Sequence, residues 1–304
     1  MASLSALLTI NIGIDPEIQK FGGLLLTWHG VFTAVGIAAG VYLAVIIGRK
    51  QGFLEDDIYS VALLAIPCGI IGARALFVAE RWGEPGLTNA MDIFRINEGG
   101  ISIYGAVLGG IVGGAVYCFF RKLPLRRAAD VAAFGALTGM AIGRIGDIIN
   151  GEHFAEASGL PWAVRYTNIH GPSVLSHPQC GLDPVFRPSI DQLCAQHPAV
   201  GYEMVGDLLI LGLLFFVLWY VKRDGIAFFG FMLLYALMRF GVSELRIDSQ
   251  TVIAGLTTPQ VTALLLVPPS LIGLVYCWLQ GHSAEESRLP PQAASPAPAR
   301  ASGR

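Results

Sequence analysis

The residues best suited to chemistry in this chain lie in one ten-residue segment, Gly143–Glu152. It reads G-R-I-G-D-I-I-N-G-E and ends a run, Ala128–Ile149, that is otherwise almost entirely apolar or glycine. At helical spacing Arg144, Asp147 and Gly151 fall on one face, because residues three and four apart stack on the same side. An arginine inside a membrane helix costs roughly 2.5–3.5 kcal/mol on insertion scales, so it usually faces a cavity and has a function. The segment therefore predicts a site for a charged group at the edge of a bilayer.

A second arginine occupies a similar depth in a later apolar run. Tyr235 and Arg239 are four residues apart and share a helix face. Two guanidiniums that converge from two helices suit an anionic phosphate, which each can hold with two parallel hydrogen bonds. The alternative is a pair of internal salt bridges, Arg144 with Asp147 and Arg239 with Glu244. We favour the phosphate site, because the cluster exceeds what packing needs.

Other polar side chains near the ends of apolar runs are weaker candidates. Ser102 and Tyr104 follow a pair of glycines, which suits either close helix packing or close approach of a ligand. His29 lies about a third of the way into the first run, where it is either an interhelical hydrogen-bond partner or a proton carrier near neutral pH. His197 and Glu203 precede the fifth run, and Glu203 is expected at the positive end of a helix.

Metal and cysteine patterns add little chemistry. Three histidines and two aspartates of one long loop show no ligand spacing of the H-x-x-x-H kind, so we expect no metal and no cofactor. They are His170, His177, His197, Asp183 and Asp191. Cys180 and Cys194 lie in the same loop and are as consistent with a disulfide as with free thiols, whereas the other three cysteines lie in apolar runs and suit packing.

The elements that position these residues are membrane helices. Hydrophobic residues make up 54% of the chain and charged residues 14%, against about 25% charged in soluble domains. The apolar runs are continuous and long enough for a hydrocarbon core that takes ~20 helical residues, which excludes the short alternating strands of a barrel. The fold class predicted is an all-α membrane protein with seven transmembrane helices. They are placed at Gly23–Gly48, Ile58–Val78, Ile101–Phe120, Ala128–Ile149, Met204–Val221, Ile226–Leu245 and Val261–Leu279.

Basic residues orient the predicted bundle. Lysines and arginines follow the first, third and fifth runs, and the positive-inside rule then puts the N-terminus outside and the C-terminus in the cytoplasm. These basic residues are Arg49, Lys50, Arg121, Lys122, Arg126, Arg127, Lys222 and Arg223. Arg144 and the long loop 150–203 consequently lie at the outer face. The basic group 121–127, Asp130 and Asp207 are at predicted membrane edges, where we expect them to be solvated.

The chain is expected to form one polytopic domain, residues 1–280, with an outer insertion at 150–203. Residues 281–304 are rich in Pro, Ala and Ser and are expected to be a disordered cytoplasmic tail. The first nineteen residues contain no Lys or Arg, so we expect no cleavable signal peptide. Residues 10–16 are too short to span and are interpreted as an interfacial segment.

These motifs resemble a known family, the bacterial prolipoprotein diacylglyceryl transferases. The resemblance covers about Ile12 to Leu279, and its core is the family signature G-R-x-G-N-F-x-N-G-E, here Gly143–Glu152. Further matching segments stand in the same order. They are Gly99-Gly100 with Tyr104, Gly159–Val164, His197-Pro198 with Tyr202-Glu203, and Tyr235 with Arg239-Phe240.

The resemblance implies an activity and its residues. Family members transfer a diacylglyceryl group from phosphatidylglycerol to the lipobox cysteine of a prolipoprotein signal peptide, at the outer side of the bacterial inner membrane, and release glycerol phosphate. The implied partners are these two substrates and the lipid bilayer, with no nucleic acid. The implied catalytic residues are Tyr104, His29, Arg239 and Glu152. The implied substrate-binding residues are Arg144, Asp147, Asn150, Gly151, Ser102, Tyr235, His197, Glu203 and Glu244.

The chain also departs from the family pattern. Asp147 stands where the signature usually has asparagine, and His29 where a tyrosine is expected. The glutamate expected four residues after the arginine of the sixth span is Ser243, with Glu244 one place later. Tyr104 stands where many members have histidine, so we interpret His29 and Tyr104 as sharing the acid–base work.

Two other classes of protein remain alternatives. One is a divergent paralog that is non-catalytic or uses another substrate. The other is a polytopic transporter, which would be expected to place ionisable residues near the bilayer midplane and to show paired halves. Here the charges cluster near one surface and no halves match, which favours the transferase.

Overall fold

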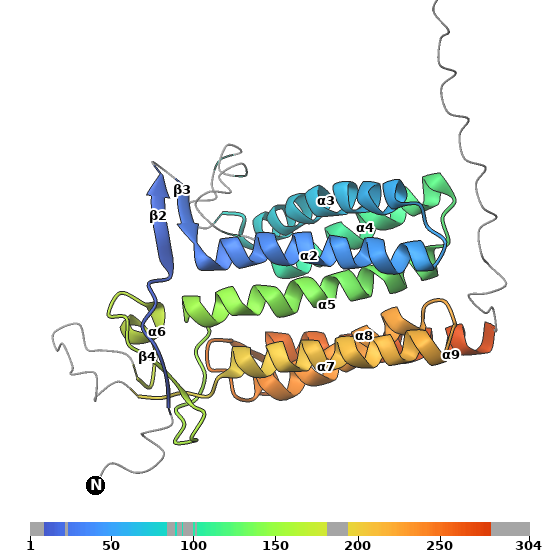
Figure 1. The fold of residues 1–304 in the computed structure, drawn as a ribbon. Helices are drawn as coiled ribbons and strands as arrows, with labels where there is room; N and C mark the ends of the chain where they lie inside the picture. The colour runs from blue at the N-terminus through green and yellow to red at the C-terminus, as the bar shows by residue number, and fades with distance from the viewer. Residues whose placement is uncertain are drawn as a thin grey trace, which may run out of the picture.

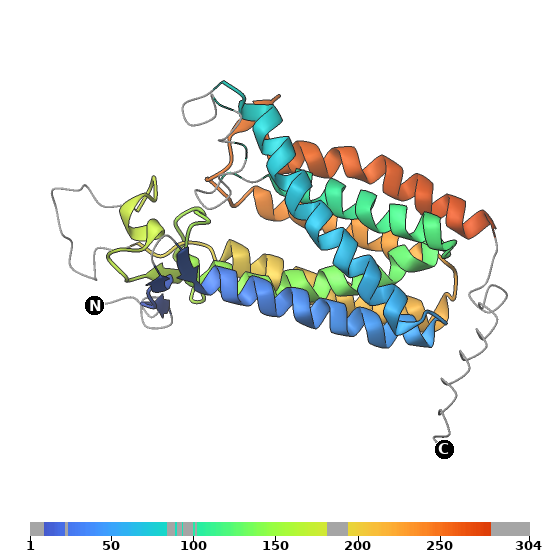
Figure 2. The ribbon, with the colours of Figure 1, turned by 90° about the horizontal axis from the view of Figure 1, so that it is seen from above.

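The computed structural model describes residues 9–21, 24–83, 89, 93, 100, 102–180 and 194–280. Among them, seven helices are long and apolar enough to cross a membrane, as the sequence predicted. They run side by side in one bundle (Figures 1 and 2). They are α2 (Trp28–Lys50), α3 (Glu55–Arg81), α4 (Ile103–Arg121), α5 (Leu125–Asn150), α7 (Ala199–Tyr220), α8 (Ile226–Ser243) and α9 (Thr258–Gln280). Gly99, Asp183, Asp191 and the tail 281–304 lie outside the described residues.

Helices α2 and α7 show the largest differences from the starting residues that the apolar runs indicated. Helix α2 begins at Trp28 rather than Gly23, because Leu24–Thr27 is a strand and the Thr27 hydroxyl caps the helix by accepting from the Gly30 amide at 3.1 Å. Helix α7 begins at Ala199, directly after Pro198, rather than at Met204. Glu203 therefore lies inside α7, in its second turn, and not ahead of it.

Glycines let the helices approach closely in two pairs. Helix α2 packs on α5 where Gly36 faces Gly139, and a Cβ on Gly36 would lie 2.6 Å from the Gly139 carbonyl oxygen. Helix α3 packs on α4 in the same manner, with Gly72 against Gly105. Small residues at such crossings permit the backbone contact that drives association in lipid. The α2–α5 contact matters for function, because it sets α2 against the end of the Gly143–Glu152 segment.

Most of the non-helical structure gathers at one end of the bundle, which we call the site end (Figure 1). Here α2, α4 and α7 begin and α5 and α8 end. Strand β1 (Ile10–Ile12) pairs in parallel with β4 (Val164–Tyr166), β2 (Glu17–Phe21) pairs antiparallel with β3 (Leu24–Thr27), and β5 (Thr251–Ile253) with β6 (Leu256–Thr257). The segment interpreted as interfacial is thus partly an extended strand bound to the loop after α5.

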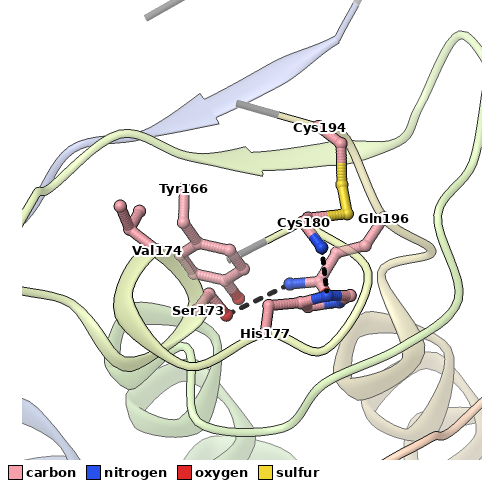
Figure 3. A pocket seen from close by; sticks show the side chains of 7 residues that line it. All are labelled: Tyr166, Ser173, Val174, His177, Cys180, Cys194 and Gln196. Carbon is pink, nitrogen blue, oxygen red and sulfur yellow. Dashed lines mark hydrogen bonds between the residues drawn. A yellow bond between two sulfur atoms is a disulfide. The ribbon is translucent and has the colours of Figure 1, made fainter. Parts of the chain in front are cut away.

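A disulfide and a short helix organise that loop. Helix α6 (Pro172–Leu175) is followed by Cys180, which is bonded to Cys194 with their Cα atoms 5.3 Å apart. The disulfide left open by the sequence is therefore present. Figure 3 shows it beside His177 and Gln196, whose side chains hydrogen-bond at 2.9 Å.

The opposite end of the bundle corrects one expectation. Arg127 and Asp130 were expected to be solvated, but both are buried. Arg127 donates to Asp224 from Nε and Nη2 at 3.1–3.2 Å, and Asp130 accepts from the amides of Gly225 and Phe228 at the start of α8. The carboxylate thus satisfies the free amides of a helix N-terminus, which burial requires. These residues hold α5 to α8 at the end away from the site.

Candidate active site

Three arginines contact one buried carboxylate at the site end. Glu203 is fully buried, and its Oε2 lies 2.8 Å from Nη2 of Arg144. Its other oxygen, Oε1, accepts from Nη1 of Arg239 and, at 3.2 Å, from Nη1 of Arg246. The three guanidiniums come from α5, α8 and the segment after α8. Helix α7 thus supplies one negative charge that brings together the two arginines predicted from the sequence, and a third.

Arg144 is surrounded by carboxylates. Nη1 donates to Oδ2 of Asp147 at 3.2 Å, one turn along α5, and Nε lies 4.0 Å from Oδ2 of Asp207. Asp207 is fully buried, one turn below Glu203 on α7, and neither of its oxygens has a hydrogen-bond partner among the described residues. The sequence predicted that Asp207 is solvated. This prediction is wrong, because the face of α7 that carries Asp207 packs inside the bundle. Tyr235 on α8 is close enough to Arg144 for an electrostatic interaction.

Arg239 is the arginine of this cluster with the fewest ion pairs among the described residues. Its side chain is 19% exposed, and in the part of the chain that the structure describes only Nη1 has a hydrogen-bond partner. Nε and Nη2 are therefore open to a ligand. The salt bridge considered between Arg239 and Glu244 does not form: Glu244 accepts from Nε2 of Gln260 at 2.6 Å instead. Ser243, where the family pattern has glutamate, is buried and donates to the Arg239 carbonyl.

His29 meets Asp147 across the α2–α5 contact. Nδ1 of His29 lies 2.6 Å from Oδ1 of Asp147. His29 is the second residue of α2, at the edge of the bundle rather than a third of the way along the helix as expected. Asp147 stands where the family signature has asparagine, and His29 stands where the first span has tyrosine. These two departures from the family pattern are therefore in direct contact.

A second layer of charge covers the arginines and was missed from the sequence. Arg246 donates from Nη2 to Asp248 at 2.5 Å and to Nδ1 of His153 at 2.8 Å. Nδ1 of His153 also lies 3.4 Å from Oδ2 of Asp248, and its Nε2 lies 3.9 Å from Oδ2 of Asp147. Burial alone would raise the pKa of Asp248, but its hydrogen bonds with His153 and Arg246 and their charges hold it below its usual value.

The signature segment ends in a left-handed turn held by the loop. Gly151 has φ of 66°, the conformation that ends α5 and that glycine adopts without strain. Tyr166 of β4 packs against it and donates to the Ile148 carbonyl at 2.9 Å, and Ser173 of α6 donates to the Gly151 carbonyl. Burial, followed by the charge of Asp147, raises the pKa of the Tyr166 hydroxyl, which therefore stays neutral. The loop thus fixes the end of α5 and with it Asp147.

The remaining predicted residues stand around this core at different distances. Tyr104, in the first turn of α4, is close enough to Arg239 for an electrostatic interaction, and Glu152 is similarly placed relative to His29. Ser102 is buried just before α4, where its amide bonds the Ala73 carbonyl. His197 instead contacts the Tyr202 hydroxyl at 3.4 Å, away from the arginines. Asn150 is the last residue of α5.

A mostly apolar cavity of about 170 Å³ lies beside the cluster. Its walls come from β1, β4 and the start of α7, and His153 contributes to its lining. The smaller space in Figure 3, about 10 Å³, is lined by the disulfide and is too small to serve as a site. Among the described residues no group of His, Cys, Asp or Glu has the geometry of a metal site.

Seven apolar helices with three arginines and their carboxylates at one end of the bundle define a polytopic membrane protein with a buried cluster of paired charges. Comparison with known proteins identifies the family: the model of the prolipoprotein diacylglyceryl transferases matches residues 16–278. The chain belongs to this family.

Relatives from several bacteria agree. A phosphatidylglycerol–prolipoprotein diacylglyceryl transferase of Clostridioides difficile is 30% identical, over 84% of this chain and 92% of the relative. Proteins with the same name from Acaryochloris marina and Bacillus cytotoxicus are each 29% identical, over 90% and 87% of this chain and 94% of either relative.

Proposed function

We propose that this protein transfers a diacylglyceryl group from phosphatidylglycerol to the cysteine thiol of a prolipoprotein lipobox and releases glycerol phosphate. The observation that carries the proposal is the meeting of Arg144 and Arg239 on Glu203 at one edge of an apolar bundle. Family membership and the names of the relatives support the same reaction. The protein is thus an enzyme of lipoprotein maturation.

The arginines suit the phosphate of the lipid donor. When the thiolate attacks the glycerol carbon, the phosphate oxygen leaves with the bonding electrons and needs positive charge beside it. Arg239 offers Nε and Nη2 without giving up a contact. Arg144 has each nitrogen beside a carboxylate, so it reaches the phosphate by exchanging its contact with Glu203 or Asp207.

The other predicted site residues take supporting roles in the proposal. Tyr104 and Ser102, at the start of α4, are placed to orient the glycerol. His29 and Glu152 lie toward the thiol side, since both are exposed at the edge of the bundle. Gly151 shapes the turn that ends α5. His197 contacts Tyr202 and Glu244 contacts Gln260, so the proposal assigns neither of them to the phosphate.

The proposed location is the bacterial inner membrane, with the site end facing outward. The basic residues after α2, α4 and α7 are all at the opposite end, which supports a cytoplasmic position for that end. The disulfide at the site end supports an oxidising compartment there. Residues 1–280 would then form the catalytic domain and 150–203 its outer region.

One experiment tests the reaction. Purified protein is incubated with phosphatidylglycerol carrying labelled acyl chains and with a lipobox peptide, and the peptide is analysed by mass spectrometry. A peptide with a thioether-linked diacylglyceryl group, absent when its cysteine is replaced by serine, is the expected result. No modified peptide with an intact, folded protein would favour a non-catalytic paralog. Labelled lipid moved across vesicles instead would favour a transporter.

A further inference from the structure

The contact between His29 and Asp147 joins an exposed base to a buried acid. The His29 side chain is 47% exposed, whereas that of Asp147 is 9% exposed, and Nδ1 lies 2.6 Å from Oδ1. This arrangement follows the logic of triads in which a carboxylate orients an imidazole. It differs from the salt bridges nearby, since one partner opens to the surroundings of the bundle.

Gly146 makes the contact possible. A Cβ at this position would lie 2.7 Å from Cα of His29 and 3.0 Å from the Trp28 carbonyl oxygen. The last turn of α5 therefore rests directly on the first turn of α2. This direct backbone contact brings Asp147 and His29 within hydrogen-bond distance.

The hydrogen bond selects a tautomer of His29. A carboxylate only accepts, so Nδ1 carries the hydrogen and Nε2 of the neutral ring keeps its lone pair. Among the described residues, the only side-chain hydrogen-bond partner of His29 is Asp147. Nε2 is therefore the free acceptor on the exposed side of the ring.

The charges nearby favour a proton on this ring. Four carboxylates and three guanidiniums of the described residues are linked by ion pairs. The carboxylates are Asp147, Glu203, Asp207 and Asp248, and the guanidiniums Arg144, Arg239 and Arg246. Glu152 and Arg144 are the other charged groups with an electrostatic effect on His29, of opposite sign. An imidazolium that forms at His29 during proton transfer is stabilised by the adjacent carboxylate of Asp147.

Asp147 also links His29 to Arg144, one of the two arginines proposed to bind the phosphate. Its Oδ1 holds His29, and its Oδ2 accepts from Arg144 at 3.2 Å. One side chain therefore sets the base and the first arginine at a fixed separation. A thiol and a lipid phosphate that react together need such a fixed geometry.

We propose that Asp147 is a positioning residue that holds His29 as the general base for the acceptor thiol, an inference that rests on the transfer reaction proposed above. Nε2 of His29 takes the S–H proton, and the sulfur electron pair forms the bond to the glycerol carbon. The bond from that carbon to the phosphate oxygen breaks, and its electron pair leaves with glycerol phosphate beside Arg239. The proton then passes from His29 to the released phosphate or to water.

The test compares single and double variants of the full-length protein in the peptide assay. His29→Ala should lower kcat by about 10²–10⁴-fold, the usual contribution of a general base. Asp147→Asn should lower kcat at least tenfold, with KM for the lipid changed by less than threefold. The double variant should be no slower than His29→Ala alone, because Asp147 acts through His29. Added imidazole should restore part of the rate of His29→Ala and none of the rate of the double variant.

A matched control and three opposing outcomes make the test decisive. His170→Ala removes an exposed histidine from the loop and should keep the wild-type rate. Asp147→Asn that slows the His29→Ala protein by the same factor as the wild type would show independent action and overturn the proposal. So would a higher KM for the lipid with unchanged kcat, which assigns Asp147 to the phosphate, or a His29→Ala protein of wild-type rate.

The two proposals fail in different ways. Wild-type protein that forms no thioether overturns the transfer reaction, and the role of His29 with it. Wild-type protein that is active while His29→Ala is equally active overturns the dyad alone. The melting temperature of each variant is measured together with its rate. Gly146→Ala pushes the last turn of α5 away from the first turn of α2 without removing His29 or Asp147, and it should therefore lower kcat.

Discussion

The role of Glu203 gives the sharpest prediction about the arginine cluster. Glu203→Gln keeps the size of the side chain and removes its charge. The glutamine oxygen can still accept from Arg239, but its amide nitrogen then faces Nη2 of Arg144, where the carboxylate oxygen lies 2.8 Å away. Two donors then oppose each other in a site with no exposed surface on Glu203.

The size of the effect follows from the burial. Breaking a buried ion pair by removing one partner costs about 3–5 kcal/mol. Each 1.36 kcal/mol is a factor of about ten in rate. The glutamine oxygen retains part of the interaction, so the lower end applies, and kcat/KM for transfer should fall by about 10²-fold. KM for phosphatidylglycerol should rise, because the two arginines are no longer held together.

The assay is the transfer of labelled diacylglyceryl to the lipobox peptide, at several lipid concentrations. Glu156→Gln serves as the control, since it makes the same chemical change at an exposed position of the site end. Both variants are checked for wild-type elution and melting temperature. If folded Glu203→Gln protein retained kcat/KM within threefold of wild type, the arginines would not need this carboxylate and the reasoning would be refuted.

Three further predictions concern the arginine fork, the loop and the opposite end. Arg144→Lys should lose transfer by more than tenfold, since an ammonium cannot face several carboxylates at once; wild-type rates in the peptide assay would contradict it. Replacing Cys180 and Cys194 by serine should lower stability by about 3 kcal/mol for a loop of this size, read as a lower melting temperature; wild-type protein treated with reductant should match the variant. Arg127→Met should cost about 3–5 kcal/mol because Asp224 is left buried without its partner, and denaturant unfolding in detergent that matches wild type would argue against a buried pair.

Much of the fold could be predicted because lipid imposes simple rules on the sequence. Each helix must bury its own backbone groups, so continuous apolar runs predict the helices. What the runs could not predict is where a helix begins when its first turn is polar. Because Tyr202 and Glu203 are polar, the apolar run began only at Met204, whereas α7 begins at Ala199. Leu24–Thr27 pairs with β2 as a strand, so α2 begins later than its apolar run.

The site was predictable in its residue types and not in its pairings. Arg144 and Asp147 are near in sequence, and their contact follows from helical spacing. The partners of His29 and Arg239 are 118 and 36 residues away, so only the packing of α2 on α5 and α7 on α8 reveals them. Arg127 was expected to be solvated because it lies near the end of an apolar run. It is buried because Asp224 lies across from it, a compensation that composition does not show.

The cluster at the site end is best understood as one charge network. Each guanidinium there would be costly to bury alone, and so would each carboxylate, because an unpaired ion in a low-dielectric region is strongly unfavourable. Glu203 forms ion pairs with three arginines, and Asp147 pairs with Arg144 and His29. A change in one member therefore alters the cost of burying its neighbours. Substitutions within the network should be non-additive, and a phosphate that binds Arg144 in the proposed reaction must displace one of the carboxylate partners of that arginine.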